Sequence, residues 1–433
     1  MHTEAEKDIK MDGCEESGET ADRMPGAAPE AAAENEGFAR SLLSWYYAHR
    51  RILPWREDPT PYHVWLSEIM LQQTRVEAVK AYYERFLAAL PDIASLAAAE
   101  EDRYMKLWEG LGYYSRVRNL HKGAVTIMET YGGHMPENAA ELQKVPGIGP
   151  YTAAAIASIA FGESVPAVDG NLLRVFARLT AYGDSIKEDK ARKEAFAYYL
   201  EKMRPLEKYI LKGGAEGRRA GEDKPGPAAG AGHNEQGDFN QALMDLGATV
   251  CLPNAAPRCG ECPLQSFCTA CAQGMQTAFP VMPPKKERKA QELTVFLIHD
   301  AEKIALRKRG SKGLLAGMYE YPNVPGHLSE KEAVQAVKEM GFPPLRIRRL
   351  EDARHIFTHR EWYMRGYEIL ADELEGQKKP EEGKQPTELK QPAPMPGGEI
   401  FLAEIREIRD VYSIPSAFAA FTGVLLPETG NRK

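Results

Sequence analysis

Apolar side chains recur at helical spacing through the first part of the chain. In the segments 38–49, 62–74, 76–90 and about 180–211, apolar residues fall three or four positions apart, as they do along one face of an amphipathic helix. The segment 76–90 has the pattern of a helix that belongs to the core. We therefore predict that this part of the chain is all helical.

A glycine-rich break interrupts this helical pattern at residues 146–150, PGIGP. The break cannot lie inside a helix, because Gly147 and Gly149 permit positive φ and Pro150 suits the first turn of a following helix. Gly162 is then expected to end that helix. Such a break presents backbone N–H groups at a helix N-terminus, an arrangement that binds phosphate. An ordinary turn between two helices has the same sequence pattern.

The pattern changes toward alternation of apolar and polar residues after about residue 292. Five short segments are predicted to be strands. They are 293–298, 303–307, 318–321, 346–350 and 362–369. Ser329 and Glu332 have the spacing of a capping box, which predicts a helix ending near Met340. Residues 405–411 fit either a short helix or a strand.

Four stretches without periodic apolar positions divide the chain. The first is predicted to be a disordered tail, the third a linker, and the other two flexible insertions. They are residues 1–36, 213–237, 281–291 and 376–398. What remains is a helical domain at 37–280 and an α+β domain at 292–426.

Composition describes a soluble globular protein, with 43% hydrophobic and 27% charged residues among 433. The net charge of −7 excludes a chain coated in positive charge, but a local basic cluster and backbone amides still suffice to bind DNA. No run of about 18 apolar residues is present, so no membrane span is expected. Without a signal-peptide core at the start, cytoplasmic residence is the expectation, in association with the nucleoid.

Five of the six cysteines lie between residues 251 and 271. The gaps between the first four are seven, two and five residues. Zinc sites usually have paired Cys-x-x-Cys hooks, whereas these four contain one such hook. Four thiolates at this spacing are more typical of a 4Fe–4S cluster. The candidate ligands are Cys251, Cys259, Cys262 and Cys268, with Cys271 as a competing fourth ligand.

Two further features carry candidate chemistry. Glu68 is flanked by Leu66, Ile69 and Met70; if it is buried among them, its pKa rises and it becomes a proton donor at neutral pH. Alternatively Glu68 faces water on the other side of its helix. The segment 108–121 combines aromatic and cationic residues, as a base-flipping wedge does, although its tyrosines also suit the core and its arginines the solvated surface.

Several of these motifs together resemble the adenine-specific mismatch DNA glycosylases, the MutY type, of the helix-hairpin-helix endonuclease III superfamily. The motifs are SEIMLQQT at 67–74, GLGYYSR at 110–116, the hairpin with its aspartate at 142–171, and DFNQALMDLG at 238–247. The resemblance covers nearly everything from Phe38 to about Leu425. It implies removal of adenine mispaired with 8-oxoguanine or guanine from double-stranded DNA, by a monomer, leaving an abasic site.

The resemblance also implies roles for individual residues. Glu68 protonates adenine, and Asp169 stabilises the sugar cation, electrostatically or through a transient covalent bond. Bifunctional relatives carry a lysine where this chain has Tyr151, so base removal by water alone is expected. The Tyr151 hydroxyl is expected to orient Asp169, the alternative being a packed ring. The implied contacts to DNA or adenine are Arg56, Gln73, Leu111, Tyr113, Arg116, Arg118, Gly147, Gly149, Asn171 and Gln241.

The α+β region resembles a nudix domain that lacks the glutamate-rich, magnesium-binding helix, so binding without hydrolysis is expected. In the family a Phe-Ser-His loop reads 8-oxoguanine, and this chain has Phe357, Thr358 and His359 instead. Thr358 keeps the hydroxyl group; the alternative is a plain turn.

The family has six residues between the first two cysteines of the cluster, whereas this chain has seven. The five-residue third gap favours Cys268 over Cys271 as fourth ligand.

The predicted fold is thus an all-helical helix-hairpin-helix glycosylase domain with an iron–sulfur loop, followed by an α+β nudix-like domain. Three rival functions remain open. One is a bifunctional glycosylase and lyase, another a non-enzymatic iron–sulfur protein for redox work or DNA binding, and the third a nudix-type nucleotide hydrolase. Tyr151 counts against the first, the paired motifs of Glu68 and Asp169 against the second, and the missing acidic helix against the third.

Overall fold

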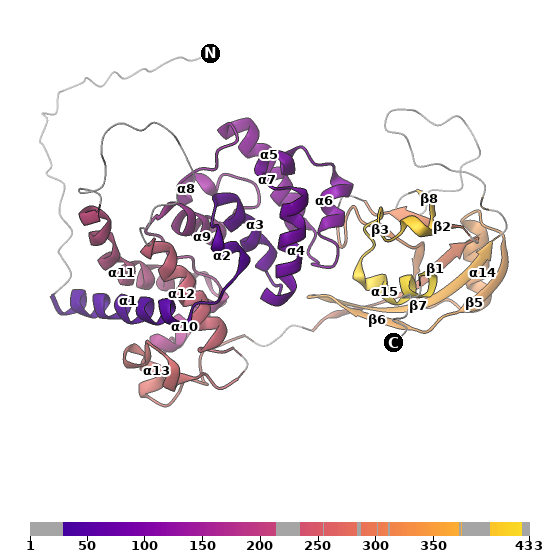
Figure 1. Ribbon diagram of the computed structural model, residues 1–433. Helices are drawn as coiled ribbons and strands as arrows, with labels where there is room; N and C mark the ends of the chain where they lie inside the picture. The colour runs from indigo at the N-terminus through magenta and orange to yellow at the C-terminus, as the bar shows by residue number, and fades with distance from the viewer. Residues whose placement is uncertain are drawn as a thin grey trace, which may run out of the picture.

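The computed structural model describes residues 29–213, 234–253, 255–283, 287–300, 302–310, 312–371, 374 and 399–426. A helical part and a β-rich part lie next to each other, with α6 at the junction (Figure 1). In these described ranges no helix is long and apolar enough to cross a membrane.

The helical part contains the elements α1 to α13. They are α1 (Pro29–His49), α2 (Pro54–Glu57), α3 (Pro61–Leu71), α4 (Val76–Ala89), α5 (Ile93–Ala97), α6 (Glu101–Leu107), α7 (Ser115–Tyr131), α8 (Ala139–Leu142), α9 (Pro150–Phe161), α10 (Gly170–Leu179), α11 (Asp189–Gly213), α12 (Glu235–Thr249) and α13 (Thr269–Ala272). Two short 3-10 turns, Cys259–Glu261 and Gln265–Phe267, precede α13. The prediction of an all-helical domain is confirmed.

Two hydrophobic cores divide these helices into two lobes. The first core, around Trp65 and Trp108, holds together the helices from α3 through α9. The second, around Phe38 and Tyr199, joins α1, α10, α11 and α12 and reaches the cysteine loop. Because α9 belongs to the first lobe and α10 to the second, the segment between them lies where the lobes meet.

Two predicted boundaries are corrected. Helix α1 begins at Pro29, inside the tail that was expected to be disordered up to residue 36; Glu34 in its second turn pairs with Lys202 of α11 at 2.8 Å. The insertion expected at 213–237 is shorter, because Asn234 accepts a hydrogen bond from the Gly237 N–H and begins α12. The rest of the tail, most of the first insertion and all of the second insertion lie outside the described residues.

As far as the chain is described, the β-rich part is an eight-stranded sheet with a helix on each face. Its elements are β1 (Lys289–His299), β2 (Lys303–Lys308), β3 (Tyr319–Glu320), β4 (Asn323–Pro325), α14 (Glu330–Glu339), β5 (Pro344–Arg349), β6 (Ala353–Ile356), β7 (Arg360–Ala371), β8 (Ile400–Glu404) and α15 (Ala419–Leu425), with 3-10 turns at Ile405–Glu407 and Ser416–Phe418. The main path is β3-β2-β1-β7-β5, while β4 pairs with β1, β6 with β7 and β8 with β2. The five predicted strands are present, and a 3-10 turn opens the ambiguous segment 405–411.

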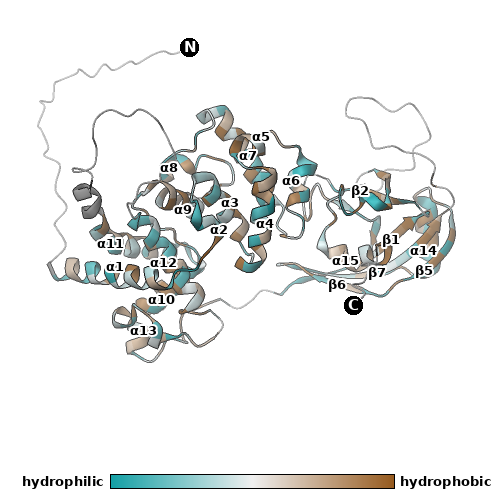
Figure 2. Ribbon diagram, in the orientation of Figure 1, coloured by the Kyte–Doolittle hydropathy of each residue, from teal (hydrophilic) through white to brown (hydrophobic). Residues whose placement is uncertain are grey.

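The centre of the sheet is the parallel pair β1 and β7, in register from Lys289 opposite Arg360 to His299 opposite Leu370. The second half of β1, residues 293–298, is buried on both faces and is largely apolar (Figure 2). One face packs against Ala333 and Val337 of α14. The other packs against Phe421 of α15. A strand covered on both sides has a continuous apolar run rather than alternation.

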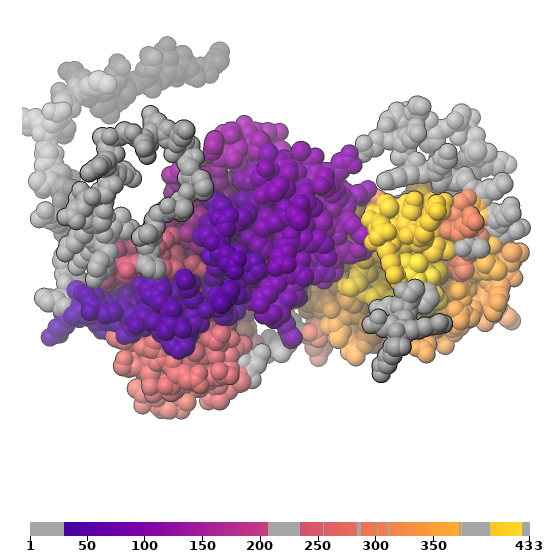
Figure 3. Space-filling view, viewed as in Figure 1, coloured from indigo at the N-terminus to yellow at the C-terminus, as the bar shows by residue number. Residues whose placement is uncertain are grey.

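The two parts touch through α6, α7 and the turn before β3. Asp102 accepts hydrogen bonds from Lys308 at 3.2 Å and from Tyr319 at 3.2 Å. The side chain of Met318 packs in the first helical core. In the space-filling view, atoms of the two parts are in contact at this junction (Figure 3). The β-rich part is therefore docked against the segment that precedes the predicted wedge.

Candidate active site

A cavity of about 640 Å³ lies between the two helical lobes. Its walls come from α2, α3, α9, α10 and α12, so both lobes contribute. Seven of the predicted site residues line it, namely Arg56, Glu68, Gln73, Tyr151, Asp169, Asn171 and Gln241. Residues from distant parts of the sequence are thus brought to one space, large enough for a nucleobase.

Glu68 lies on α3 at the wall of this cavity and is only 7% exposed. The Tyr151 hydroxyl donates a hydrogen bond to its Oε2 at 2.5 Å. Burial raises the pKa of Glu68 to about 7, and the Asp169 charge adds to the rise, whereas the Tyr151 bond and Arg56 oppose it. Of the two interpretations that the sequence allowed, the structure supports the one in which Glu68 is buried. Its carboxyl group can therefore release a proton near neutral pH.

Asp169 is the N-cap of α10. Its Oδ1 accepts the Leu172 N–H at 2.8 Å, and its Oδ2 accepts Asn171 Nδ2 at 2.9 Å. Burial raises the pKa of Asp169, against the lowering effect of these donors. The helix N-terminus and the N–H partners favour the anionic form of Asp169 and so oppose the effect of burial. The predicted bond from Tyr151 is corrected, because that hydroxyl donates to Glu68 instead.

Arg56 is fixed by Asp245, a residue that the sequence did not single out. Asp245 is 1% exposed on α12. It accepts two bonds from Arg56, at 2.8 and 3.0 Å, and one from Arg51 Nε at 2.7 Å. Burial alone raises the pKa of Asp245, but the bonds and charge of Arg56 outweigh it and lower that pKa. The sequence did contain one signal for this buried charge, an aspartate between Met244 and Leu246 in a helical pattern.

Arg174 connects Asn171 to the cysteine loop and was also missed. Its Nη2 donates to Asn171 Oδ1 at 3.0 Å and to the Gly247 carbonyl at 2.7 Å. Its Nε donates to the Cys251 carbonyl at 2.9 Å. Asn171 in turn holds Asp169, so a continuous path of hydrogen bonds joins the catalytic candidate to the loop.

The glycine hairpin forms as predicted and lies outside the cavity lining. Gly147 has φ of +83°, and a Cβ there would meet the Cβ of Asn119 at 2.7 Å. Gly149 is the N-cap of α9, which begins at Pro150. Both glycines are exposed. The hairpin therefore offers backbone N–H groups to the solvent at the start of a helix, as an anion site requires.

The predicted wedge residues differ in exposure. Tyr113 is 46% exposed, with φ of +48°. Leu111 is 7% exposed and packs in the first helical core, so the DNA contact expected of Leu111 is not open in this structure. Gln73 is exposed at the cavity with φ of +59°. Left-handed conformations are costly for residues other than glycine, so Gln73 and Tyr113 are both held in place by their surroundings.

Arg116 has a different role from the predicted phosphate contact. Its side chain is buried, and Nη1 donates to the carbonyls of Ile69, Met70 and Gln72 at 2.7–2.9 Å. Its Nη2 donates to the Leu111 carbonyl at 3.1 Å and to that of Gly112 at 3.1 Å. Burial lowers the pKa of Arg116 to about 10. The guanidinium thus ties the end of α3 to the wedge loop.

Arg118 is also engaged inside the protein rather than open to phosphate. It pairs with Glu101 at 2.8 Å, and its Nη2 donates to the carbonyl of Ala316 in the β-rich part. Gly317 has φ of +68°, and a side chain there would collide with Arg118. The phosphate contact expected of Arg118 is therefore corrected to a contact between the two parts of the molecule.

Phe357, Thr358 and His359 form the turn between β6 and β7. The Phe357 ring packs edge-on against Trp362, with centroids 4.9 Å apart. Thr358 and His359 are exposed. The Thr358 Oγ1 lies 2.5 Å from the Tyr113 hydroxyl. The turn is therefore separate from the cavity but reaches the wedge loop.

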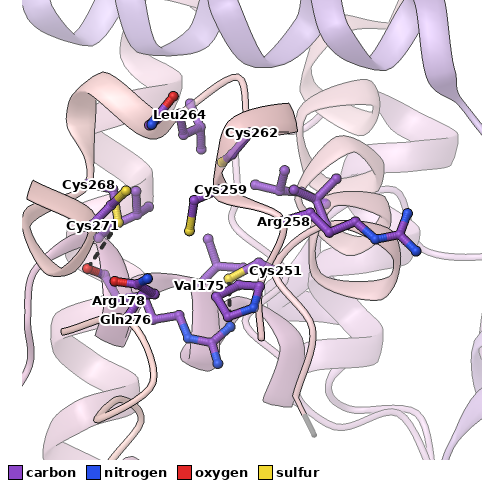
Figure 4. Close-up of a pocket in the computed structure, with 15 residues that line it drawn as sticks. Val175, Arg178, Cys251, Arg258, Cys259, Cys262, Leu264, Cys268, Cys271 and Gln276 are labelled. Carbon is purple, nitrogen blue, oxygen red and sulfur yellow. Dashed lines mark hydrogen bonds between the residues drawn. The ribbon is translucent and has the colours of Figure 1, made fainter. Parts of the chain in front are cut away.

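The five clustered cysteines line one largely apolar cavity beneath α10 and α12. In Figure 4, Cys259 lies between Cys268 and Cys271 on one side and Cys251 and Cys262 on the other. Arg178 Nη1 donates to the Cys251 sulfur at 3.1 Å. The Cys268 thiol donates to the Arg178 carbonyl at 3.3 Å.

Within the described residues, no three His, Cys, Asp or Glu side chains come together around a single metal ion. Thiols arranged around an enclosed space suit a cluster of several atoms better than one ion, since each ligand binds a different iron. Burial raises the pKa of Cys262 to about 12, so a bound cation is needed to hold it as a thiolate. This set of donors is compatible with an iron–sulfur cluster.

Two family models match the chain, one in each part. Residues 66–199 match the HhH-GPD superfamily base excision DNA repair protein family, and residues 294–419 match the NUDIX domain. A solved thermostable thymine-DNA glycosylase is 24% identical, with a TM-score of 0.44, over 56% of this chain and 98% of that one.

Curated relatives match most of the chain. The human adenine DNA glycosylase is 33% identical over 405 residues, which are 80% of this chain and 68% of the relative. The adenine DNA glycosylase of Buchnera aphidicola subsp. Acyrthosiphon pisum is 29% identical over 323 residues, or 74% and 83% of the two chains. Together with the cavity and its two carboxyls, these matches establish that the chain belongs to the adenine DNA glycosylases, DNA-binding repair hydrolases that cleave the N-glycosidic bond without cutting the strand.

Proposed function

We propose that this glycosylase removes adenine mispaired with 8-oxoguanine or guanine, acting as a monomer on double-stranded DNA. The observation that carries the proposal is that Glu68 and Asp169 face one cavity from different lobes, in different environments. Glu68 has one hydroxyl donor and a pKa raised to about 7. Asp169 has a backbone and an amide donor at a helix N-terminus. Two carboxyls held in such different settings divide the roles of acid and anion.

The adenine first leaves the base stack and enters the cavity. Neutral Glu68 donates its proton to a ring nitrogen, which turns the base into a better leaving group. The Tyr151 hydroxyl bonded to Glu68 stabilises the carboxylate that forms. Arg56 adds a positive charge near this carboxylate.

Asp169 then stabilises the oxocarbenium-like sugar, electrostatically or through a transient covalent bond, until water adds. Its position is set by the Leu172 N–H and by Asn171. Tyr151 supplies no amine to attack the sugar. The product is an abasic site on an intact strand.

Recognition of the opposite base is assigned to the turn at Phe357, Thr358 and His359. The Thr358 hydroxyl is exposed and adjacent to Tyr113, so a base read by the turn lies close to the loop that disturbs the stack. Gly147 and Gly149 offer N–H groups to the phosphates.

The cofactor is proposed to be a 4Fe–4S cluster held by Cys251, Cys259, Cys262 and Cys268. When bound, such a cluster cross-links the cysteine loop. The loop itself supports Arg174, which holds Asn171. The chain's own contribution to catalysis is therefore the positioning of Asp169 through Asn171.

The test is single-turnover cleavage of duplexes with adenine opposite 8-oxoguanine, guanine or thymine, scored with and without hot alkali. The chain and its Asp169→Asn variant are compared, with Asp184→Asn as a control because Asp184 is an exposed partner of Lys190. We expect alkali-dependent breaks with the first two duplexes, lost in Asp169→Asn alone. Equal cleavage opposite thymine, or full activity of Asp169→Asn, contradicts the proposal.

A further inference from the structure

A fifth thiol lies in the cavity where four are needed. Cys271 lines the same space as Cys251, Cys259, Cys262 and Cys268. Cys271 is therefore turned toward the other thiols rather than toward solvent (Figure 4).

Cys268 and Cys271 are close alternatives along the chain. Cys268 is the N-cap of α13, and Cys271 lies in the same single turn of helix. Residues three apart in a helix lie on the same side, so both side chains approach the cavity from one direction. The Cys268 thiol donates to the carbonyl of Arg178 at the end of α10, whereas Cys271 lines the same cavity as Cys259.

The loop on the opposite side of the cavity is long enough to adapt. Seven residues separate Cys251 from Cys259, and Gly260 follows with open space where a Cβ would be. The open space at Gly260 lies directly next to Cys259 in the chain.

We propose that Cys271 is a reserve ligand that completes the cluster when Cys268 is missing. This inference depends on the proposed cluster. When Cys268 is missing, one iron–sulfur bond to Cys271 would form at the iron that Cys268 would otherwise bind. The Cys271 thiol would release its proton to the solvent, and no electron would be transferred.

The experiment measures iron and sulfide per chain, visible absorption, and the electron paramagnetic resonance spectrum of full-length protein purified without oxygen. The variants are Cys268→Ser, Cys271→Ser and the double variant, with Cys262→Ser as the control for an irreplaceable ligand. We expect Cys271→Ser to match the parent. Cys268→Ser retains at least half of the iron with an altered spectrum, and the double variant loses it as Cys262→Ser does.

Two results overturn the inference. One is a Cys268→Ser protein as poor in iron as Cys262→Ser. The other is a double variant that keeps as much iron as Cys268→Ser, which shows that Cys271 is not the ligand. A parent protein without iron overturns the proposed cofactor itself, and glycosylase activity measured on the same samples separates that failure from a failure of the proposed function.

Discussion

The hydroxyl oxygens of Tyr113 and Thr358 lie 2.5 Å apart, although 245 residues separate them in the chain. Tyr113 belongs to the loop before α7, and Thr358 to the turn between β6 and β7. The contact joins the residue expected to disturb the base stack to the residue expected to read the opposite base. Tyr113 is 46% exposed, so the pair is accessible to DNA.

Removing either hydroxyl is predicted to have the same consequence. Tyr113→Phe and Thr358→Val each remove the hydrogen bond that joins the wedge loop to the turn between β6 and β7. Each variant should therefore bind more weakly to a duplex with 8-oxoguanine opposite a non-cleavable adenine analogue. The expected loss of affinity is roughly 1 kcal/mol, or about fivefold. The double variant is expected to be no weaker than the single ones. If the double variant loses as much affinity as the two single variants together, the two hydroxyl groups do not share one hydrogen bond.

Arg116→Lys is predicted to destabilise the protein without removing a phosphate contact. Lysine cannot satisfy the carbonyls of α3 and of the wedge loop together, so the unfolding free energy falls by roughly 2–4 kcal/mol. Urea titration measures this loss. Tyr113 and Gln73 lose their support, so single-turnover cleavage slows as well.

The salt dependence of DNA binding separates this role from a phosphate contact. We expect the slope of log affinity against log salt to be the same for Arg116→Met and the parent. A phosphate contact would reduce the slope by about 0.9. A reduction of that size shows that the buried position of Arg116 does not persist on DNA.

Asp245→Asn is predicted to lower thermal stability strongly. Asp245 is 1% exposed and pairs with Arg51 and Arg56. Removing its charge leaves two cations without their partner, at a cost of roughly 3–5 kcal/mol. The matched control is Glu36→Gln, which breaks an exposed pair with Arg40 and should cost under about 1 kcal/mol. Equal melting temperatures for the two variants contradict the assignment.

Glu68→Gln is predicted to be more stable than the parent at high pH. The pKa of Glu68 is raised in the folded protein from 4.5 to about 7. A group raised in this way contributes stability below the unfolded pKa and loses it as pH rises through the folded value. The advantage of Glu68→Gln therefore grows between about pH 4.5 and 7, to on the order of 3 kcal/mol.

Urea titrations at pH 5 and pH 8 measure this difference, with Glu129→Gln on exposed α7 surface as the control. The control should change little at either pH. A Glu68→Gln advantage that is constant with pH shows that Glu68 does not titrate in this range.

The sequence indicated residues whose chemistry depends on their immediate neighbours. The positive φ of Gly147 could be predicted locally. The apolar neighbours of Glu68 left its burial open, and only the resemblance of residues 67–74 to the family motif favoured a buried carboxyl. Asp245 could not be predicted locally, because its partner Arg56 is 189 residues away. The start of α1 was missed for the same reason, since Glu34 is held by Lys202 of α11.

Arg116 shows a different limit. The local sequence around an arginine beside aromatic residues is the same whether the guanidinium binds phosphates or carbonyl oxygens. The partner of Arg116 is set by how closely α3 approaches the wedge loop, which the local sequence does not show. Likewise, nothing local indicated that the Tyr151 hydroxyl lies next to Glu68 rather than Asp169, because the relative position of α3, α9 and α10 is set by packing.

The most direct test of Glu68 as the proton donor is the pH dependence of single-turnover adenine release in the parent and in Tyr151→Phe. The parent rate should fall as pH rises through about 7, because Glu68 loses its proton. The Tyr151 hydroxyl lowers the pKa of Glu68, so its removal should move this fall to higher pH. A fall at the same or a lower pH in Tyr151→Phe contradicts the account.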